Sequence, residues 1–182
     1  KDLINNSTFD SLTGCFNRYS SKKVLENADG SLHMCDIDNF KNVNDSLGHP
    51  AGDRILKEVS DVLIEIANEN NGYAFRWGGE EFLLYFRGSN LQQTKFLAES
   101  IRSKVESKTP VTLSVGFTRI KEFHDLSDAL ELIDSFLHQS RIEENYQPTK
   151  ICRNLHALKT FALNAVSLHP YKRELYFSLR LH

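Results

Sequence analysis

The chain has 182 residues, of which 40% are hydrophobic and 25% are charged, and this length is sufficient for one domain with a packed core. A formal net charge of −2 argues against a nucleic-acid-binding surface, and no segment is long and apolar enough to span a membrane. No signal peptide is visible, and the three cysteines (Cys15, Cys35 and Cys152) lack a paired pattern. We therefore expect a cytoplasmic protein, or the cytoplasmic part of a larger protein that is anchored in a membrane.

Hydrophobic periodicity predicts five helices, near residues 17–27, 39–46, 52–68, 91–107 and 126–143. Strands are predicted at residues 32–38, at residues 73–75 and 82–86 as a hairpin, and once more before the last helix. This order predicts an α/β fold in which a mixed central sheet is flanked by helices. Residues 1–9 are expected to be the stump of a linker helix, and residues 10–152 the domain. Residues 153–182 are expected to be a helical C-terminal extension, for which the sequence indicates no role.

The first candidate site residues end a buried strand. Its apolar run is followed by two acids, Asp36 and Asp38. Most buried strands do not end in this way, and acids that bind ligands often lie at the carboxyl ends of strands in α/β sheets. The pair therefore indicates a binding site at this end of the sheet.

A second pair of acids lies at the tip of the predicted hairpin, in Gly78-Gly79-Glu80-Glu81. Paired carboxylates repel each other, and a divalent cation would relieve that cost, while the glycines would let a bulky ligand approach the backbone. If the hairpin lies beside the buried strand, Asp36 and Glu80 or Glu81 can converge on one or two hard cations, for which Mg²⁺ is suited. The alternative is a solvated turn, since glycine and charge are common in turns.

The turn after the buried strand, at residues 39–45, has the composition of an anion site. A strand-to-helix turn presents backbone N–H groups to an anion, and Lys41 adds positive charge. The alternative is an ordinary helix start with Asn39 as its N-cap.

The next break, at residues 48–53, contains two glycines and a proline and separates two helices. Asp53 is expected to open the second of them, an amphipathic helix. Its carboxylate could complement the helix dipole. Alternatively, Asp53 and Asn44 could bind a base edge together, because a carboxylate can accept from the N1–H and the exocyclic amine of guanine. The spacing leaves both interpretations open.

These residues belong to longer motifs. The motifs are Asp10-Ser11-Leu12-Thr13-Gly14 with Asn17-Arg18, Asp36-Ile37-Asp38-Asn39-Phe40-Lys41 with Asn44-Asp45, Gly48-His49 with Gly52-Asp53, and Arg76-Trp77-Gly78-Gly79-Glu80-Glu81-Phe82. In this order they resemble the GGDEF family of bacterial diguanylate cyclases, here in a GGEEF variant, and Val111-Thr112-Leu113-Ser114-Val115-Gly116 resembles a later central strand of that family. The resemblance covers roughly residues 10–142 and implies a fold like the palm of polymerases and class III nucleotide cyclases.

The resemblance also implies an activity. Such domains condense two GTP molecules into cyclic di-GMP and release two pyrophosphates, with one GTP held by each protomer of a dimer. A symmetric product made from one site per chain requires two-fold pairing, at least transiently. The family usually serves as the output module of a bacterial signalling protein, so a sensory domain is expected upstream.

The resemblance assigns roles to individual residues. Two Mg²⁺ (or Mn²⁺) ions would be held by Asp36, the Ile37 carbonyl and Glu80. Phe40 and Lys41 would hold the β- and γ-phosphates, and Asn44 and Asp53 would read guanine. Glu81 would lie near the reacting 3′-hydroxyl and assist its deprotonation, while Gly78 and Gly79 would leave room for the α-phosphate and ribose.

Two stretches depart from the family pattern. The inhibitory product site Arg-x-x-Asp is replaced by Glu69-Asn70-Asn71-Gly72, so no product inhibition through that site is expected. Near the last helix, Arg141 stands where a phosphate-binding lysine is expected, and arginine can also bind phosphate. Asn145 replaces an expected arginine, with Glu143 and Glu144 beside it. This change motivates the alternative of a weak or inactive domain that acts as a GTP-binding or protein-interaction regulatory module.

Overall fold

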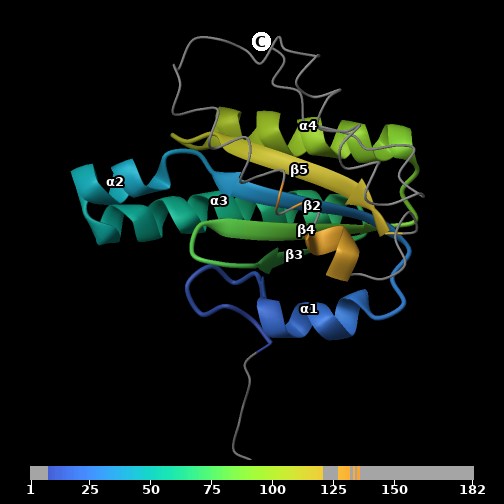
Figure 1. Ribbon diagram of the computed structural model, residues 1–182. Helices are drawn as coiled ribbons and strands as arrows, with labels where there is room; N and C mark the ends of the chain where they lie inside the picture. The colour runs from blue at the N-terminus through green and yellow to red at the C-terminus, as the bar shows by residue number, and fades with distance from the viewer. Residues whose placement is uncertain (1–7, 121–126, 132, 134, 136–182) are drawn as a thin grey trace, which may run out of the picture.

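The centre of the sheet is a strand that is buried along its whole length. This strand, β2 (Gly30–Ile37), is buried at all eight positions. The computed structural model describes residues 8–120, 127–131, 133 and 135 of the chain. Within them the sheet has five strands in the order β1-β3-β4-β2-β5 (Figure 1). The other strands are β1 (Phe16–Asn17), β3 (Gly72–Arg76), β4 (Glu81–Arg87) and β5 (Leu113–Arg119).

The sheet is mixed, as predicted. β2 pairs antiparallel with β4 on one side and with β5 on the other, and β3 and β4 form the predicted hairpin. The short β1 adds a parallel pair at the β3 edge. Because β2 is central and buried on both faces, its polar end is held at a fixed place between two neighbours.

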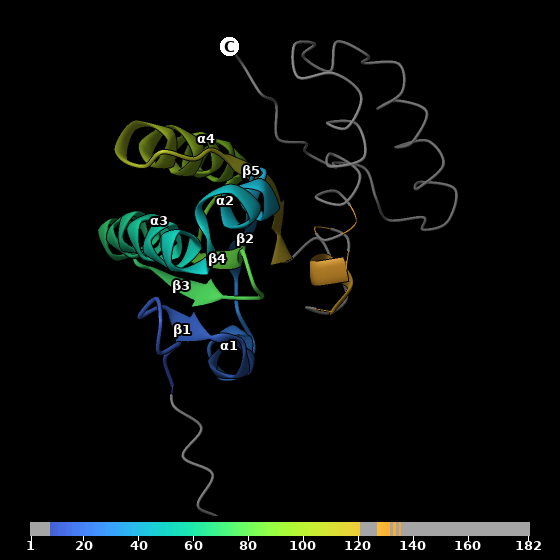
Figure 2. The ribbon, with the colours of Figure 1, turned by 90° about the vertical axis from the view of Figure 1, so that its left-hand side faces the viewer.

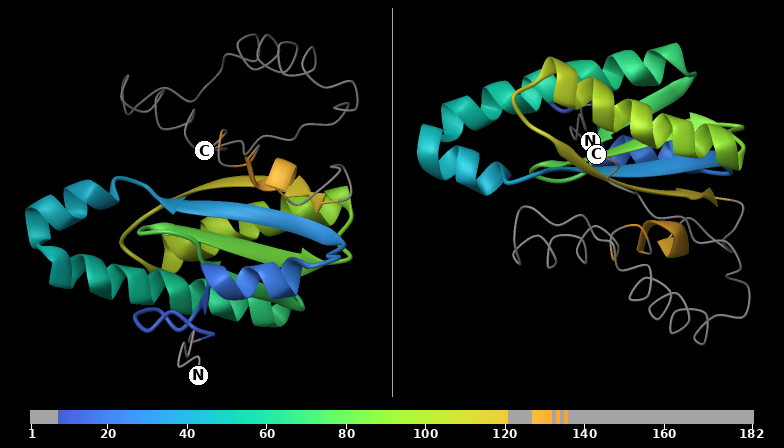
Figure 3. Two further views of the ribbon diagram at one scale, coloured as in Figure 1. Left: turned by 60° about the horizontal axis from the view of Figure 1, so that its bottom comes forward. Right: turned by 90° about the horizontal axis from the view of Figure 1, so that it is seen from above.

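Helices cover both faces of this sheet (Figures 2 and 3). α3 (His49–Glu69) and α4 (Leu91–Lys108) cover one face, where their apolar residues pack against alternate residues of β2, β4 and β5. α1 (Arg18–Leu25) and helical residues between 127 and 135 cover the other, where Leu25, Ala129 and Ile133 pack against Met34 and Leu83. α2 (Phe40–Leu47) lies against α3 and projects beyond the end of the sheet (Figure 1).

Four of the five predicted helices match described helices. The structure corrects two predictions, the start of α3 and the number of strands. α3 begins at His49 rather than at residue 52, because Pro50 is favourable in a first turn and the break falls at Gly48, where φ is 80°. Asp53 therefore lies in the second turn and does not open the helix. The edge strand β1 was not expected, since two residues leave no periodic signal. Residues 1–7 of the linker helix predicted at residues 1–9 lie outside the described residues, and residues 8–9 are not helical, since Phe9 forms an isolated bridge with Phe16. Most of the helix predicted at 126–143 and the extension predicted at 153–182 also lie outside the described residues.

Arg76 connects the hairpin tip, residues 77–80, to the turn at residues 10–14 through hydrogen bonds. Its guanidinium donates to the carbonyl oxygens of Gly78 (3.2 Å) and Gly79 (2.8 Å), and to Asp10 Oδ1 (3.0 Å). The same Asp10 oxygen accepts from the backbone N–H (2.9 Å) and hydroxyl (2.7 Å) of Thr13. One arginine thus joins two carbonyls of the tip to the turn at residues 10–14.

This arrangement favours the charged form of Asp10. Burial alone would raise the pKa of the carboxyl, but hydrogen bonds from Thr13 and Arg76 outweigh it and hold the pKa below its ordinary value. On the other side of the tip, the guanidinium of Arg18 lies 4.5 Å from the ring centroid of Trp77. The hydrogen bonds of Arg76 and the contact of Arg18 with Trp77 therefore fix the conformation of the tip, although Gly79 is exposed.

Replacing Arg76 by lysine should lower the free energy of unfolding by about 1–3 kcal/mol, because one ammonium group cannot reproduce the fork that reaches two carbonyls and a carboxylate. Urea unfolding measures the change. Arg54→Lys, at an exposed position of α3, is the matched control and should shift stability by less than about 0.5 kcal/mol. An Arg76→Lys protein as stable as this control would show that the guanidinium does not hold the tip.

Candidate functional site

Two acids from neighbouring strands face each other at one end of the sheet. Asp36 of β2 is directly opposite Glu81 of β4 in the antiparallel register. Opposite residues of such a pair project from the same face, with Cβ atoms about 4.5–5.5 Å apart. Asp36 is only 3% exposed, and Glu81 is half-buried. Acidic side chains that project from the same face of adjacent strands can both be ligands of one divalent cation.

Glu80 lies one residue earlier, in the turn. Its backbone carbonyl accepts the N–H of Ile37 at 3.3 Å, so the end of β2 touches the hairpin tip through its backbone. The structure thus brings Asp36, Ile37, Glu80 and Glu81 together, as the sequence predicts. It adds that Glu81, rather than Glu80, is the register partner of Asp36.

The two glycines of the tip differ in their surroundings. A Cβ built on Gly78 would overlap the carboxylate oxygen Oε2 of Glu81, whereas a Cβ on Gly79 would meet no atom within 4 Å. Neither glycine has a positive φ. A side chain at residue 78 would therefore displace the Glu81 carboxylate that lies over Gly78, and Gly79 leaves an open approach to the backbone.

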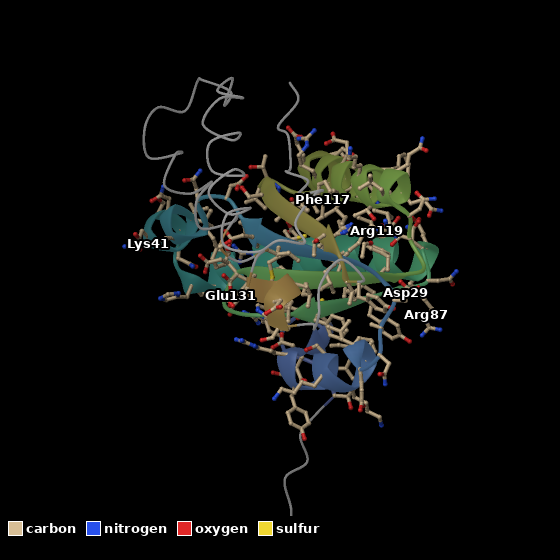
Figure 4. All side chains as sticks on the ribbon, turned by 45° about the vertical axis from the view of Figure 1, so that its right-hand side comes forward. Asp29, Lys41, Arg87, Phe117, Arg119 and Glu131 are labelled. Carbon is tan, nitrogen blue, oxygen red and sulfur yellow. The ribbon has the colours of Figure 1, made fainter. Side chains whose placement is uncertain are left out.

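The turn into α2 does not have an ordinary side-chain cap. Asn39 is the N-cap residue, but its φ is 57° and its side chain makes no capping hydrogen bond. The first N–H groups of a helix have no partner within it, and those of Phe40 and Lys41 belong to this set. Phe40 is buried, while Lys41 is exposed at the α2 end of the molecule, far from Asp29 and Arg87 (Figure 4). The geometry agrees with the anion-site interpretation better than with a capped helix start.

Asn44 and Asp53 are brought near each other where α2 meets α3. A Cβ on Gly52 would overlap Oδ1 of Asn44 and would lie 3.1 Å from the ring of Phe40. The absence of a side chain at residue 52 thus lets the Asn44 amide lie beside the residue that precedes Asp53. Asp53 is exposed and follows the first turn, where the effect of the helix dipole is already weak. The interpretation of Asp53 as a dipole partner therefore has little support.

Asp38, the second acid of the strand end, was predicted to be part of the binding site, but the sequence assigned it no specific role. Its Oδ2 accepts the hydroxyl of Thr112 at 2.5 Å and its Oδ1 accepts the hydroxyl of Ser114 at 2.6 Å. The Asp38 N–H also donates to the Thr112 carbonyl at 3.0 Å. Two hydroxyl residues alternating along the predicted last strand were the available signal.

The donor set suits a metal that arrives with a nucleotide. Among residues 8–120 and the described residues between 127 and 135, no three His, Cys, Asp or Glu side chains form a cluster that could hold an ion. Mg²⁺ needs no such cluster, because it is commonly bound through one or two carboxylates together with water and substrate phosphates. Asp36, the hairpin acids and the Ile37 carbonyl fit this pattern.

Other groups with metal-binding or nucleophilic chemistry are sequestered. Burial raises the pKa of Cys15 to about 12 and lowers the pKa of His33 to about 3, so both side chains are neutral near pH 7.

Glu69, at the position of the family's inhibitory arginine, forms an ion pair with Lys104 at 2.6 Å. Arg141 and Asn145 lie outside the described residues.

A cavity of about 300 Å³ lies away from the acids, lined by Asn70, Phe86, Arg87, Gly88, Ser89, Gln93, Phe96 and Leu97. Arg87 is at the end of the molecule opposite Lys41 (Figure 4). The hollow therefore forms no part of the candidate site.

Comparison with known proteins places this geometry in a family. The family model described as "Diguanylate cyclase, GGDEF domain" matches residues 7–146. Diguanylate cyclase DgcS of Shewanella oneidensis is 32% identical over 155 residues, which cover 78% of this chain and 52% of DgcS. The uncharacterized membrane protein SERP0413 of Staphylococcus epidermidis is 32% identical over 159 residues, covering 76% of this chain and 44% of that protein. The chain thus spans about half the length of these two relatives.

Solved structures of GGDEF proteins are also similar to this chain. The GGDEF domain of DgcB from Caulobacter crescentus, in complex with c-di-GMP, has a TM-score of 0.69 at 27% identity and covers 79% of this chain and 92% of that one. Diguanylate cyclase SiaD from Pseudomonas aeruginosa, in complex with its activator SiaC, has a TM-score of 0.67 at 30% identity, covering 76% of this chain and 59% of that one. These likenesses confirm the expected fold, and in the described part of the chain no helix has both the length and the apolar character of a membrane span. The chain belongs to the GGDEF family, whose model is that of a diguanylate cyclase domain.

Proposed function

We propose that the chain is an active diguanylate cyclase domain, which condenses two GTP molecules into cyclic di-GMP and releases two pyrophosphates. The observation that carries this proposal is the opposition of Asp36 and Glu81 across β2 and β4, with the Ile37–Glu80 backbone contact beside it. Family membership supports the same conclusion. A structural role alone would not explain why two acids of like charge are held face to face at the end of a buried strand.

Mg²⁺ or Mn²⁺, two ions per site, would be held by Asp36, the Ile37 carbonyl and Glu80. Such ions neutralise charge on the phosphates and lower the pKa of a bound hydroxyl. Glu81 would accept the proton of the attacking 3′-hydroxyl. Glu81 is also the register partner of Asp36. Mutation must therefore determine which of Glu80 and Glu81 binds the metal and which accepts the proton.

The nucleotide would lie along α2. Its β- and γ-phosphates would accept hydrogen bonds from the N–H groups of Phe40 and Lys41 at the uncapped start of α2, with Lys41 and Arg141 adding charge. Guanine would be read by Asn44 and Asp53. Gly79 leaves open space at the tip, which is where the ribose and α-phosphate would approach.

Catalysis would need two chains, because each site holds one GTP and the 3′-hydroxyl of one nucleotide attacks the α-phosphate of the other. The similarity to SERP0413, which is named a membrane protein, supports placing this domain on the cytoplasmic side of a larger protein with a sensory region. SiaD is known in complex with an activator protein. A GTP-binding or protein-interaction regulatory module is therefore the second candidate, motivated by Asn145 in place of an arginine.

Artificially dimerised protein incubated with GTP and Mg²⁺ should form cyclic di-GMP, detected by mass spectrometry. Glu80→Gln and Glu81→Gln should each lower the rate by more than about a hundredfold, beyond the loss typical of groups that only support a metal ligand. Glu58→Gln, at an exposed position of α3, is the matched control and should retain the rate. Retained GTP binding without product at full dimer occupancy would instead favour the regulatory module, and full activity of Glu80→Gln would remove Glu80 from the metal set.

Asp53→Ser should relax the preference for GTP over ATP, since serine cannot accept from both N–H groups of guanine. A loss of about tenfold or more in the ratio of kcat/KM values is expected when hydrogen bonds that discriminate a base are removed. Asp61→Ser, also exposed and farther along α3, should leave the ratio unchanged. Equal selectivity in both variants would exclude Asp53 from base recognition.

A further inference from the structure

The carboxyl end of β2 carries two acids with different surroundings, and the sheet order separates them. β4, with the hairpin acids, is on one side of β2, and β5 is on the other. Asp36 is opposite Glu81 of β4. The two oxygens of Asp38 instead accept hydroxyls from Thr112 and Ser114, both on the β5 side. The carboxylate of Asp38 is thus drawn away from the hairpin acids.

The hydrogen bond of Ser114 also distinguishes Asp38 from Asp36. Ser114 is directly opposite Asp36 in the β2–β5 register, so its side chain is as close to Asp36 as cross-strand partners are. Its hydroxyl nevertheless donates to Asp38, at 2.6 Å. Asp38 is 9% exposed, and each of its two carboxyl oxygens accepts a hydroxyl, from Thr112 and from Ser114. The hydroxyls of Thr112 and Ser114 thus donate to Asp38 rather than to Asp36.

These bonds hold the last residue before the turn. The Asp38 N–H donates to the Thr112 carbonyl, which extends the β2–β5 ladder one step beyond the pair Ile37–Leu113. Asn39 follows with φ of 57° and α2 begins at Phe40. On the other side the Ile37 N–H donates to Glu80. Asp38 is therefore where the metal-facing end of β2 and the start of α2 are fixed to β5.

We propose that Asp38 is a positioning residue and not a metal ligand: through Thr112 and Ser114 it fixes Asp36, the Ile37 carbonyl and the start of α2 for a metal-bound nucleotide. This inference rests on the proposed function of the site. Groups that orient metal ligands through hydrogen bonds typically change metal affinity by about 10–100-fold when they are removed. The two hydroxyls should therefore matter for binding although neither approaches the metal.

The test compares Thr112→Val with Ser114→Ala, Asp38→Asn, and the three changes combined. Binding of Mn²⁺ in the presence of a non-hydrolysable GTP analogue is measured by electron paramagnetic resonance, and urea unfolding confirms that each variant is folded at the temperature used. Thr118→Val is the matched control, because Thr118 is on the same strand and, four residues from Ser114, on the same face of the sheet. It should bind like the unmodified protein.

A positioning role predicts that Thr112→Val with Ser114→Ala weakens Mn²⁺–nucleotide binding about 10–100-fold although Asp38 is intact, and that adding Asp38→Asn changes little further. A ligand role predicts the reverse: loss of the hydroxyls leaves binding unchanged or tighter, and Asp38→Asn alone removes it. That result, or unchanged binding in every variant, would overturn the inference. If the unmodified protein binds neither Mn²⁺ nor the analogue, the proposed function fails and this inference fails with it.

Discussion

The register of β2 between β4 and β5 is the constraint on which the site depends. β2 is buried on both faces, and a shift of one residue would exchange the side chains that it contributes to the two core clusters. The observed register puts Asp36 opposite Glu81 of β4 and opposite Ser114 of β5. The packing of the core therefore also keeps these two acidic residues opposite each other, as the proposed metal site requires.

The features around this pair keep its parts in place. Arg76 joins the carbonyls of Gly78 and Gly79 to Asp10, so the hairpin tip is fixed to the first turn of the domain. Asp38 is held by β5 on the other side of β2. A site built in this way needs little rearrangement, which would reduce the cost of orienting the proposed nucleotide.

The sequence was most informative where one residue type has few uses. Two acids after an apolar run and two glycines before two acids predicted the strand end, the hairpin and their contact. The sequence could not show that Glu81 rather than Glu80 faces Asp36, since this depends on how many residues the turn takes up. It also placed the start of α3 three residues late, because Pro50 reads as a break although it is favourable within a first turn. The sequence marked Asp38 as a candidate but could not show its contacts, because its partners, Thr112 and Ser114, are more than seventy residues away in the sequence.

The central claim is that Asp36 and the hairpin acids bind divalent metal together with a guanine nucleotide. A crystal structure of the protein with Mn²⁺ and a non-hydrolysable GTP analogue, using the anomalous scattering of manganese, tests it most directly. The account predicts manganese between the carboxylate of Asp36 and a carboxylate of the hairpin, with phosphate oxygens completing its coordination. A bound nucleotide whose manganese touches neither Asp36 nor Glu80 or Glu81 would contradict it.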